Sequence, residues 1–239
     1  MLRPFALQAL VAIATTPGGV PGAQEPPLRL IEQTSQEGFP LERAFPGRGA
    51  PRLKAAGVFL RIRDGRKLYA LCLYVDVQAL ARLTRGRPRD VEALARLLVE
   101  GRAAHAFVAR IVEPFPRERR MAFLLGNLER AWPGPGFDPK SPAIRRFSRF
   151  FDEALAPGDE TQVWVAPSGR IRARKPGGPV QSTRDAVLAS AFTATYLGDR
   201  CMDPALKADL LRELPAVLEL EEVLASRVGR PPGKRTPRP

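Results

Sequence analysis

The stretch GVFLRIRDGRKLYALCLYVD, residues 57–76, decides the fold because its pattern is that of two strands joined by a tight turn. Two sets of side chains alternate along residues 58–63 and again along residues 68–75, with the period of two that a strand requires. Asp64 and Gly65 separate the two runs. Because Gly accepts a positive φ and Asp can hydrogen-bond the nearby backbone, this dipeptide predicts a hairpin turn.

The rest of the chain divides into helices and further strands by the same signals. Apolar spacing predicts helices at residues 77–83, 91–98, 116–132, 144–155, 183–197, 204–214 and 216–228. Alternation predicts strands at residues 105–112, 162–165 and 169–174. Since strands and helices do not alternate regularly, we expect an α+β fold, with an antiparallel sheet and helices layered on one face.

Length and composition indicate one domain and no nucleic-acid partner. With 239 residues, of which 44% are hydrophobic and 26% charged, the chain can bury one substantial core. The net charge of +13 includes five basic residues in SRVGRPPGKRTPRP, residues 226–239, which has no acidic residue and predicts a disordered tail. The other arginines are scattered and lack the aromatic interleaving of a nucleic-acid surface.

The N-terminus has the pattern of a signal peptide. Arg3 precedes a short apolar run at residues 5–15, which is followed by the breaking sequence PGGVPGA and is too short to span a bilayer. The alternative is an ordinary buried helix, since Pro21 stands where a cleavage site has a small residue. The expected divisions are a signal peptide at 1–23, an N-terminal extension at 24–38, the folded domain at 39–228 and the basic tail at 229–239. This predicts a periplasmic or secreted protein without an integral membrane segment.

Residues for standard catalytic centres are missing from the sequence. The single histidine, His105, lies in a strand pattern and is expected to be packed, and Cys72 and Cys201 are expected to be unpaired thiols. We therefore expect no transition-metal site, and the sequence contains no nucleophile elbow, P-loop or dinucleotide fingerprint. No cofactor is expected, and any site must use Arg, Tyr, Asn and Thr side chains.

Four further stretches, together with the hairpin, carry a resemblance to a known family. They are FPLERAFPGRGAPRLKAAG (39–57), NLERAW (127–132), FFDEALAPGDETQVWVAPSGR (150–170) and YLGDRCMDPALKADLL (196–211). In their order and spacing the chain resembles the chalcone isomerase-like family over residues 39–212. The resemblance is to a bacterial, exported member, closer to the fatty-acid-binding branch than to the plant enzymes. It implies an antiparallel sheet layered with helices that enclose an apolar cleft.

The resemblance also implies site residues. Arg61 and Asn127 match the strand arginine and the helix asparagine of the enzymes, whereas Tyr69 replaces their strand threonine and Arg120 their helix tyrosine. An arginine followed by a tyrosine resembles the fatty-acid-binding branch, in which the two side chains hold the ligand's carboxylate. The expected ligand-binding residues are Arg61, Tyr69, Arg120 and Asn127, with no catalytic residue. A fatty acid or similar amphipathic carboxylate is the expected partner.

Other interpretations of these residues stay open at this point. The protein could be an isomerase or intramolecular lyase on another substrate, or a scaffold whose cleft is filled by side chains. Arg61 could be a surface arginine and Tyr69 a core aromatic. Arg120 and Asn127 are two helical turns apart and therefore lie on one stripe of the helix. The simpler account of both residues is that they face solvent.

The length of the hairpin loop decides whether a carboxylate site can form. A two-residue loop at Asp64 and Gly65 with regular pairing points Arg61 and Tyr69 to opposite faces. A three-residue loop at residues 63–65, with Gly65 left-handed, puts Arg61 diagonally beside Tyr69. We expect the three-residue loop, because the site requires it.

Overall fold

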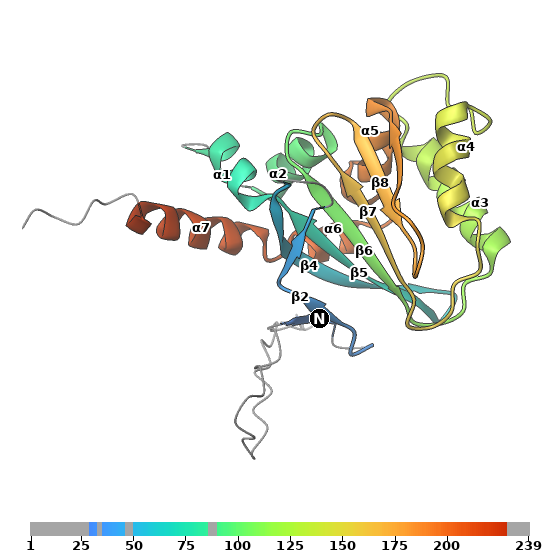
Figure 1. Cartoon of the computed structure of the whole chain (residues 1–239), viewed down its shortest axis with the longest axis horizontal. Helices are drawn as coiled ribbons and strands as arrows, with labels where there is room; N and C mark the ends of the chain where they lie inside the picture. Colours follow the sequence, from blue (N-terminus) through green and yellow to red (C-terminus); the bar gives the residue numbers. More distant parts are fainter. Residues whose placement is uncertain (1–28, 33–34, 46–49, 86–89, 229–239) are drawn as a thin grey trace, which may run out of the picture.

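A seven-stranded antiparallel sheet forms the frame of the protein (Figure 1). The computed structural model describes residues 29–32, 35–45, 50–85 and 90–228. The strands lie side by side in the order β3 (Glu42–Ala44), β4 (Arg52–Arg63), β5 (Arg66–Val75), β6 (His105–Ile111), β7 (Glu160–Val165), β8 (Arg170–Arg174) and β9 (Gln181–Arg184). A separate two-stranded sheet pairs β1 (Arg29–Ile31) with β2 (Gly38–Pro40).

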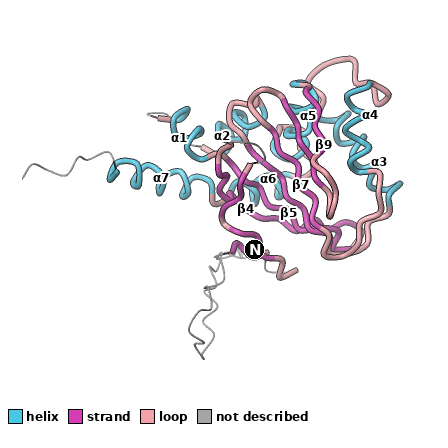
Figure 2. Tube along the Cα trace, in the orientation of Figure 1, coloured by secondary structure: helices cyan, strands magenta, loops and turns pink. Residues whose placement is uncertain are grey.

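The helices pack on one face of this sheet, and Figure 2 shows several of them behind the strands. They are α1 (Val77–Thr84), α2 (Val91–Val99), α3 (Arg117–Ala131), α4 (Pro142–Ser148), the short 3₁₀ helix η1 (Arg149–Phe151), α5 (Ala186–Leu197), α6 (Pro204–Leu211) and α7 (Leu214–Val228). Side chains of Asp76, Asp90, Ser141, Asp185 and Asp203 cap helix N-termini by accepting backbone hydrogen bonds. The α+β fold expected from the sequence is confirmed.

Strands β1, β2 and β3 were not expected from the sequence, and two expected helices have other bounds. The expected helix at 183–197 begins at Ala186, because residues 181–184 form the edge strand β9 and Asp185 caps the helix. The expected helix at 144–155 ends earlier, since η1 closes at Phe151 and Leu155 forms a bridge with Phe115. The chain between η1 and β7 thus lies against the entry to α3.

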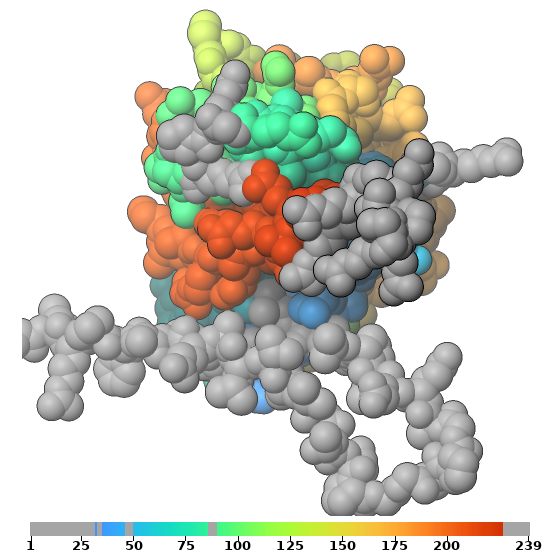
Figure 3. Space-filling model, turned by 90° about the vertical axis from the view of Figure 1, so that its left-hand side faces the viewer, coloured from blue at the N-terminus to red at the C-terminus, as the bar shows by residue number. Residues whose placement is uncertain are grey.

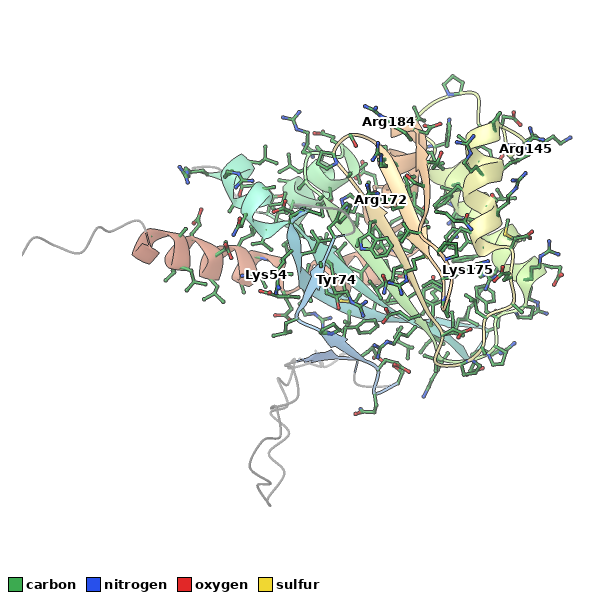
Figure 4. The ribbon with its side chains drawn as sticks, viewed as in Figure 1. Lys54, Tyr74, Arg145, Arg172, Lys175 and Arg184 are labelled. Carbon is green, nitrogen blue, oxygen red and sulfur yellow. The ribbon has the colours of Figure 1, made fainter. Side chains whose placement is uncertain are left out.

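Strand β5 divides the interior into two cores. Tyr69, Leu71 and Leu73 belong to the core beneath the helices, whereas Cys72 and Tyr74 belong to a smaller core on the other face. Segment 38–45 covers that second core, and the Tyr74 hydroxyl donates a hydrogen bond of 2.7 Å to the carbonyl of Pro40 in β2 (Figure 4). Both faces of the central strands are therefore buried.

Helix α7 extends beyond the sheet and is held by contacts with α1 and β4. It packs beside α1, and Figure 3 shows the two helices together at one end of the molecule. Lys54 of β4 forms an ion pair of 2.7 Å with Glu221 of α7. Within the described ranges, no helix has the length and apolarity needed to cross a bilayer.

The β4–β5 hairpin has a two-residue loop, so the expected three-residue loop was wrong. Arg63 pairs with Arg66, and both loop residues have positive φ, 52° at Asp64 and 73° at Gly65, as in a type I′ turn. A β-bulge follows at once, because Ile62 pairs with Lys67 while Arg61 pairs with Tyr69. With a two-residue loop and no bulge, Arg61 and Tyr69 would point to opposite faces of the sheet. The extra residue in β5 brings them to the same face, where they lie directly opposite each other.

Candidate functional site

An apolar cavity of about 70 Å³ lies between the sheet and helices α3 and α5. Strands β5, β6 and β7 form its floor, and α3, η1 and α5 form its roof. Its apolar lining includes Leu71, Phe107, Ala109, Ile111, Phe115, Phe123, Leu124, Phe151, Leu155, Val163, Phe192 and Met202. Among the residues expected from the sequence, Tyr69, Arg120 and Asn127 also line it.

Tyr69 presents its phenol to this cavity from a fully buried position. Its side chain is 6% exposed, and burial raises its pKa to about 12 although the nearby charge of Arg61 lowers it. Its hydroxyl contacts the thioether of Met202, with an O–S distance of 4.0 Å. Because a thioether is a weak acceptor, this phenol retains most of its capacity as a donor.

Arg61 borders the cavity and is already paired. Its Nη1 donates to Oδ2 of Asp203 at 2.9 Å, and its side chain is 13% exposed. The guanidinium carbon lies 5.7 Å from the ring centroid of Phe123, which lines the cavity. The Nε group of Arg61 is buried without a hydrogen-bond partner. Arg61 therefore lies close to the expected position, but its guanidinium forms an ion pair with Asp203.

Arg120 is the most deeply buried cation of the site. Only 6% of it is exposed, and its Nε and Nη2 both donate to the carbonyl oxygen of Phe151. Its Nη1 is buried and has no partner. Burial lowers the pKa of Arg120, while the negative charges of Asp152 and Glu153 partly oppose this effect. The alternative account, in which Arg120 faces solvent, was wrong.

Asn127 also faces inward, two turns along α3 from Arg120. It is buried, and its amide donates to the carbonyl oxygen of Phe123 at 2.8 Å. The amide is thereby oriented by its own helix. The solvent-facing account of Asn127 was wrong as well, because α3 turns this stripe toward the cavity.

Three polar residues of the cavity were missed by the sequence analysis. Thr161 of β7 and Thr195 and Tyr196 of α5 line it, and burial raises the pKa of Tyr196 well above its ordinary value. The Tyr196 ring stacks on Phe107 at a centroid distance of 4.5 Å. The spacing of Phe192, Thr195 and Tyr196 is the i, i+3, i+4 pattern of one helix face and was the signal that could have identified them.

A second hollow of about 440 Å³ opens beside the cavity and shares two of its walls. Phe115 and Phe123 line both spaces. The second hollow, which we call the vestibule, is also lined by Arg63, Arg66 and Arg119. Arg63 lies over the Phe123 ring, with the guanidinium carbon 5.9 Å from its centroid. The two aromatic rings thus separate a basic vestibule from an apolar interior.

Other candidate groups are accounted for elsewhere in the fold. His105 is buried in the helix-side core, where Nδ1 is 3.0 Å from the carbonyl oxygen of Ala103 and Nε2 is 2.8 Å from Oγ1 of Thr193. A larger cleft of about 460 Å³ between α2 and α5 has charged walls of both signs, including the ion pair of Lys207 with Glu92. No group of acidic, His and Cys side chains suited to a metal ion occurs in the described part of the chain.

The curled sheet and its helix layer define a chalcone isomerase-like fold. A solved structure with this fold is a fatty-acid binding protein of Arabidopsis thaliana, which superposes with a TM-score of 0.64. The two share 19% sequence identity, and the match covers 80% of this chain and 99% of the other. No family model and no curated protein sequence matches this chain. The resemblance expected from the sequence is therefore confirmed at the level of fold.

Proposed function

We propose that this protein binds a fatty acid or a similar amphipathic carboxylate, without catalysis, in the cavity between the sheet and α3 and α5. The observation that carries the proposal is a set of unused donors beside an apolar hollow. Arg61 and Arg120 each have a buried N–H without a partner, and the phenol of Tyr69 meets only a thioether. Apolar side chains supply most of the remaining lining, beside Asn127, Thr161, Thr195 and Tyr196.

A carboxylate with an alkyl chain suits this combination. A guanidinium presents planar donors that match a carboxylate, and each charge-assisted hydrogen bond contributes about 1.5–3 kcal/mol. The alkyl chain would be stabilised by about 0.8 kcal/mol for each buried CH₂ group. The neighbour in fold is itself a fatty-acid binding protein, which supports the same ligand class.

The cavity is smaller than such a ligand. Pockets for drug-sized ligands measure about 300–1,000 Å³, several times the 70 Å³ found here. The vestibule adds about 440 Å³ on the other side of Phe115 and Phe123. Binding of an alkyl chain therefore requires these rings to move and join the two spaces.

The small volume of the cavity also favours a second candidate function, that of a scaffold whose cleft is filled by its own side chains. In that case Phe115, Phe123 and Met202 are core residues, and no ligand enters. A catalytic role has less support, because Tyr69 and Arg120 stand where the related enzymes carry threonine and tyrosine. Loss of one preorganised donor typically lowers a rate by about 10²–10³.

The test is binding to the purified full chain. Native mass spectrometry checks for a co-purified lipid, and calorimetry measures decanoate, myristate and palmitate. We expect saturable binding of one fatty acid per chain, and no cyclisation of a chalcone followed by its absorbance. Absence of binding for the whole series would support the filled scaffold, and efficient cyclisation would support an enzyme.

A further inference from the structure

Three arginines of the described chain have a buried guanidinium nitrogen without a hydrogen-bond partner, and they differ in how their charge is balanced. Arg43 holds Glu160 through two bonds of 2.7 Å. Arg61 holds Asp203 at 2.9 Å. Arg120 alone of the three forms no ion pair with a carboxylate of the described residues.

The acids nearest to Arg120 are engaged elsewhere. Asp152 forms an ion pair with Arg117 at 2.5 Å, and Glu153 forms one with Lys175. Both acids are substantially exposed, so their attraction for Arg120 is screened by solvent. The remaining partner of Arg120 is the neutral carbonyl of Phe151, which receives two of its N–H groups.

This arrangement leaves a fixed cation at the wall of an apolar cavity. Burying a charge without a counterion is strongly unfavourable, and such groups in proteins are ordinarily paired. The Phe151 carbonyl fixes the plane of the guanidinium, and the unpartnered Nη1 remains as a donor. An anion in the cavity would balance the charge and accept this donor.

We infer that Arg120, rather than Arg61, holds the carboxylate of the ligand, an inference that rests on the proposed function. Arg61 stays paired with Asp203. The phenol of Tyr69 lines the same cavity and supplies a neutral hydrogen bond. The site then selects an anionic head group over a neutral one attached to the same alkyl chain.

The experiment compares decanoate with 1-decanol by calorimetry on the full-length protein and three variants. Arg120→Gln removes the charge but keeps a donor for the Phe151 carbonyl. Arg130→Gln is the matched control, because Arg130 is an exposed arginine of the same helix and lines neither the cavity nor the vestibule. Arg61→Gln tests the other guanidinium of the site.

The wild type is expected to bind decanoate about 10- to 100-fold more tightly than 1-decanol, the range of one charge-assisted hydrogen bond. Arg120→Gln should abolish this preference through weaker decanoate binding, with 1-decanol still bound. Arg130→Gln should keep the preference, and Arg61→Gln should change the affinities for both ligands in the same direction.

Three results would overturn the inference, and two of them are independent of how Arg120→Gln folds. Equal binding of both ligands by the wild type would show that no cation holds the head group. Loss of the preference in Arg61→Gln, with retention in Arg120→Gln, would assign the carboxylate to Arg61 and leave the proposed function intact. Failure of the wild type to bind either ligand would remove the proposed function as well.

Discussion

The buried polar side chains around the cavity differ in how the fold satisfies them. Asn127 is held by a carbonyl of its own helix, whereas Arg120 depends on Phe151, a residue far along the chain. The sequence could place Arg120 and Asn127 on one helical stripe, because that follows from spacing alone. It could not predict their burial, because η1, which covers Arg120, reaches it only through tertiary packing.

His105 makes the stability of the protein depend on pH. Burial lowers its pKa from the ordinary 6.5 to about 4, so the folded protein holds the imidazole neutral. The unfolded chain takes up a proton first as pH falls. The stabilisation is therefore complete above about pH 6.5 and is lost as pH falls toward 4, by roughly 3 kcal/mol.

Chemical denaturation of the wild type and His105→Gln at several pH values measures this effect. Carboxyl groups with a lowered pKa, such as that of Glu160, titrate in both proteins and cancel in the difference. A difference in the free energy of unfolding that stays constant between pH 7 and pH 4 would contradict the assignment. In the neutral ring Nδ1 donates to the carbonyl oxygen of Ala103, and Nε2 lies beside Oγ1 of Thr193.

At the scale of elements, the local pattern predicted strands more securely than their pairing. The alternation on both sides of Asp64 and Gly65 identified the hairpin, but the bulge at Leu68 leaves no local signal and is set by packing on both faces of β5. Strand β9 was missed because Gln181–Arg184 is polar and short. The composition of β9 does not favour a strand, and its pairing with β8 stabilises the strand instead.

Phe123 is expected to limit ligand size, since its ring separates the cavity from the vestibule. Phe123→Ala should join the two spaces and raise the affinity for palmitate relative to decanoate. The protein should lose about 2–4 kcal/mol of stability, somewhat less than a fully buried phenylalanine, because Phe123 is half-buried. Calorimetry with both fatty acids checks the ratio, and an unchanged ratio would show that the ligand takes another route.

Gly57 is the position where β4 meets α6 most closely. A Cβ added there would lie 2.6 Å from the carbonyl oxygen of Leu210 and would also overlap that of Asp209. Gly57→Ala should therefore displace α6 and destabilise the protein by about 1–3 kcal/mol or more. Denaturant unfolding measures the change.

Gly126→Ala provides the matched control for this substitution. Gly126 is exposed within α3, and an added Cβ there meets no atom within 4 Å. The same change should stabilise the protein by about 0.5–1 kcal/mol, because alanine is the better helix former. Equal effects at the two positions would contradict the close packing of β4 on α6.

At the scale of the whole molecule, the sheet separates a large core beneath the helices from a smaller one beneath segment 38–45. The α+β class and the helix layer were predictable, because helical and strand periods are properties of each segment. The second core was not, because it joins Phe39 and Phe45 to strand residues that are distant in sequence. Exposed arginines such as Arg184 lie on the surface of this frame (Figure 4).

Processing of the N-terminus is a prediction for the whole chain, since residues 1–23 lie outside the described residues. We propose that the protein is exported to the periplasm or secreted, with cleavage after about Ala23, because a short apolar run follows Arg3. Intact-mass analysis of exported material should show a chain that begins near Gln24. Retention of Met1 in that material would refute the proposal.

The bulge in β5 also affects how relatives of this protein can be found. Leu68 has no partner in β4, so a hairpin that lacked this one residue would still place its arginine opposite its tyrosine across the same two-residue turn. The two positions would then be one step closer in sequence with no change in their geometry. A search that fixes the distance between arginine and tyrosine would miss such chains, whereas an alignment that permits a gap beside the turn would recover them.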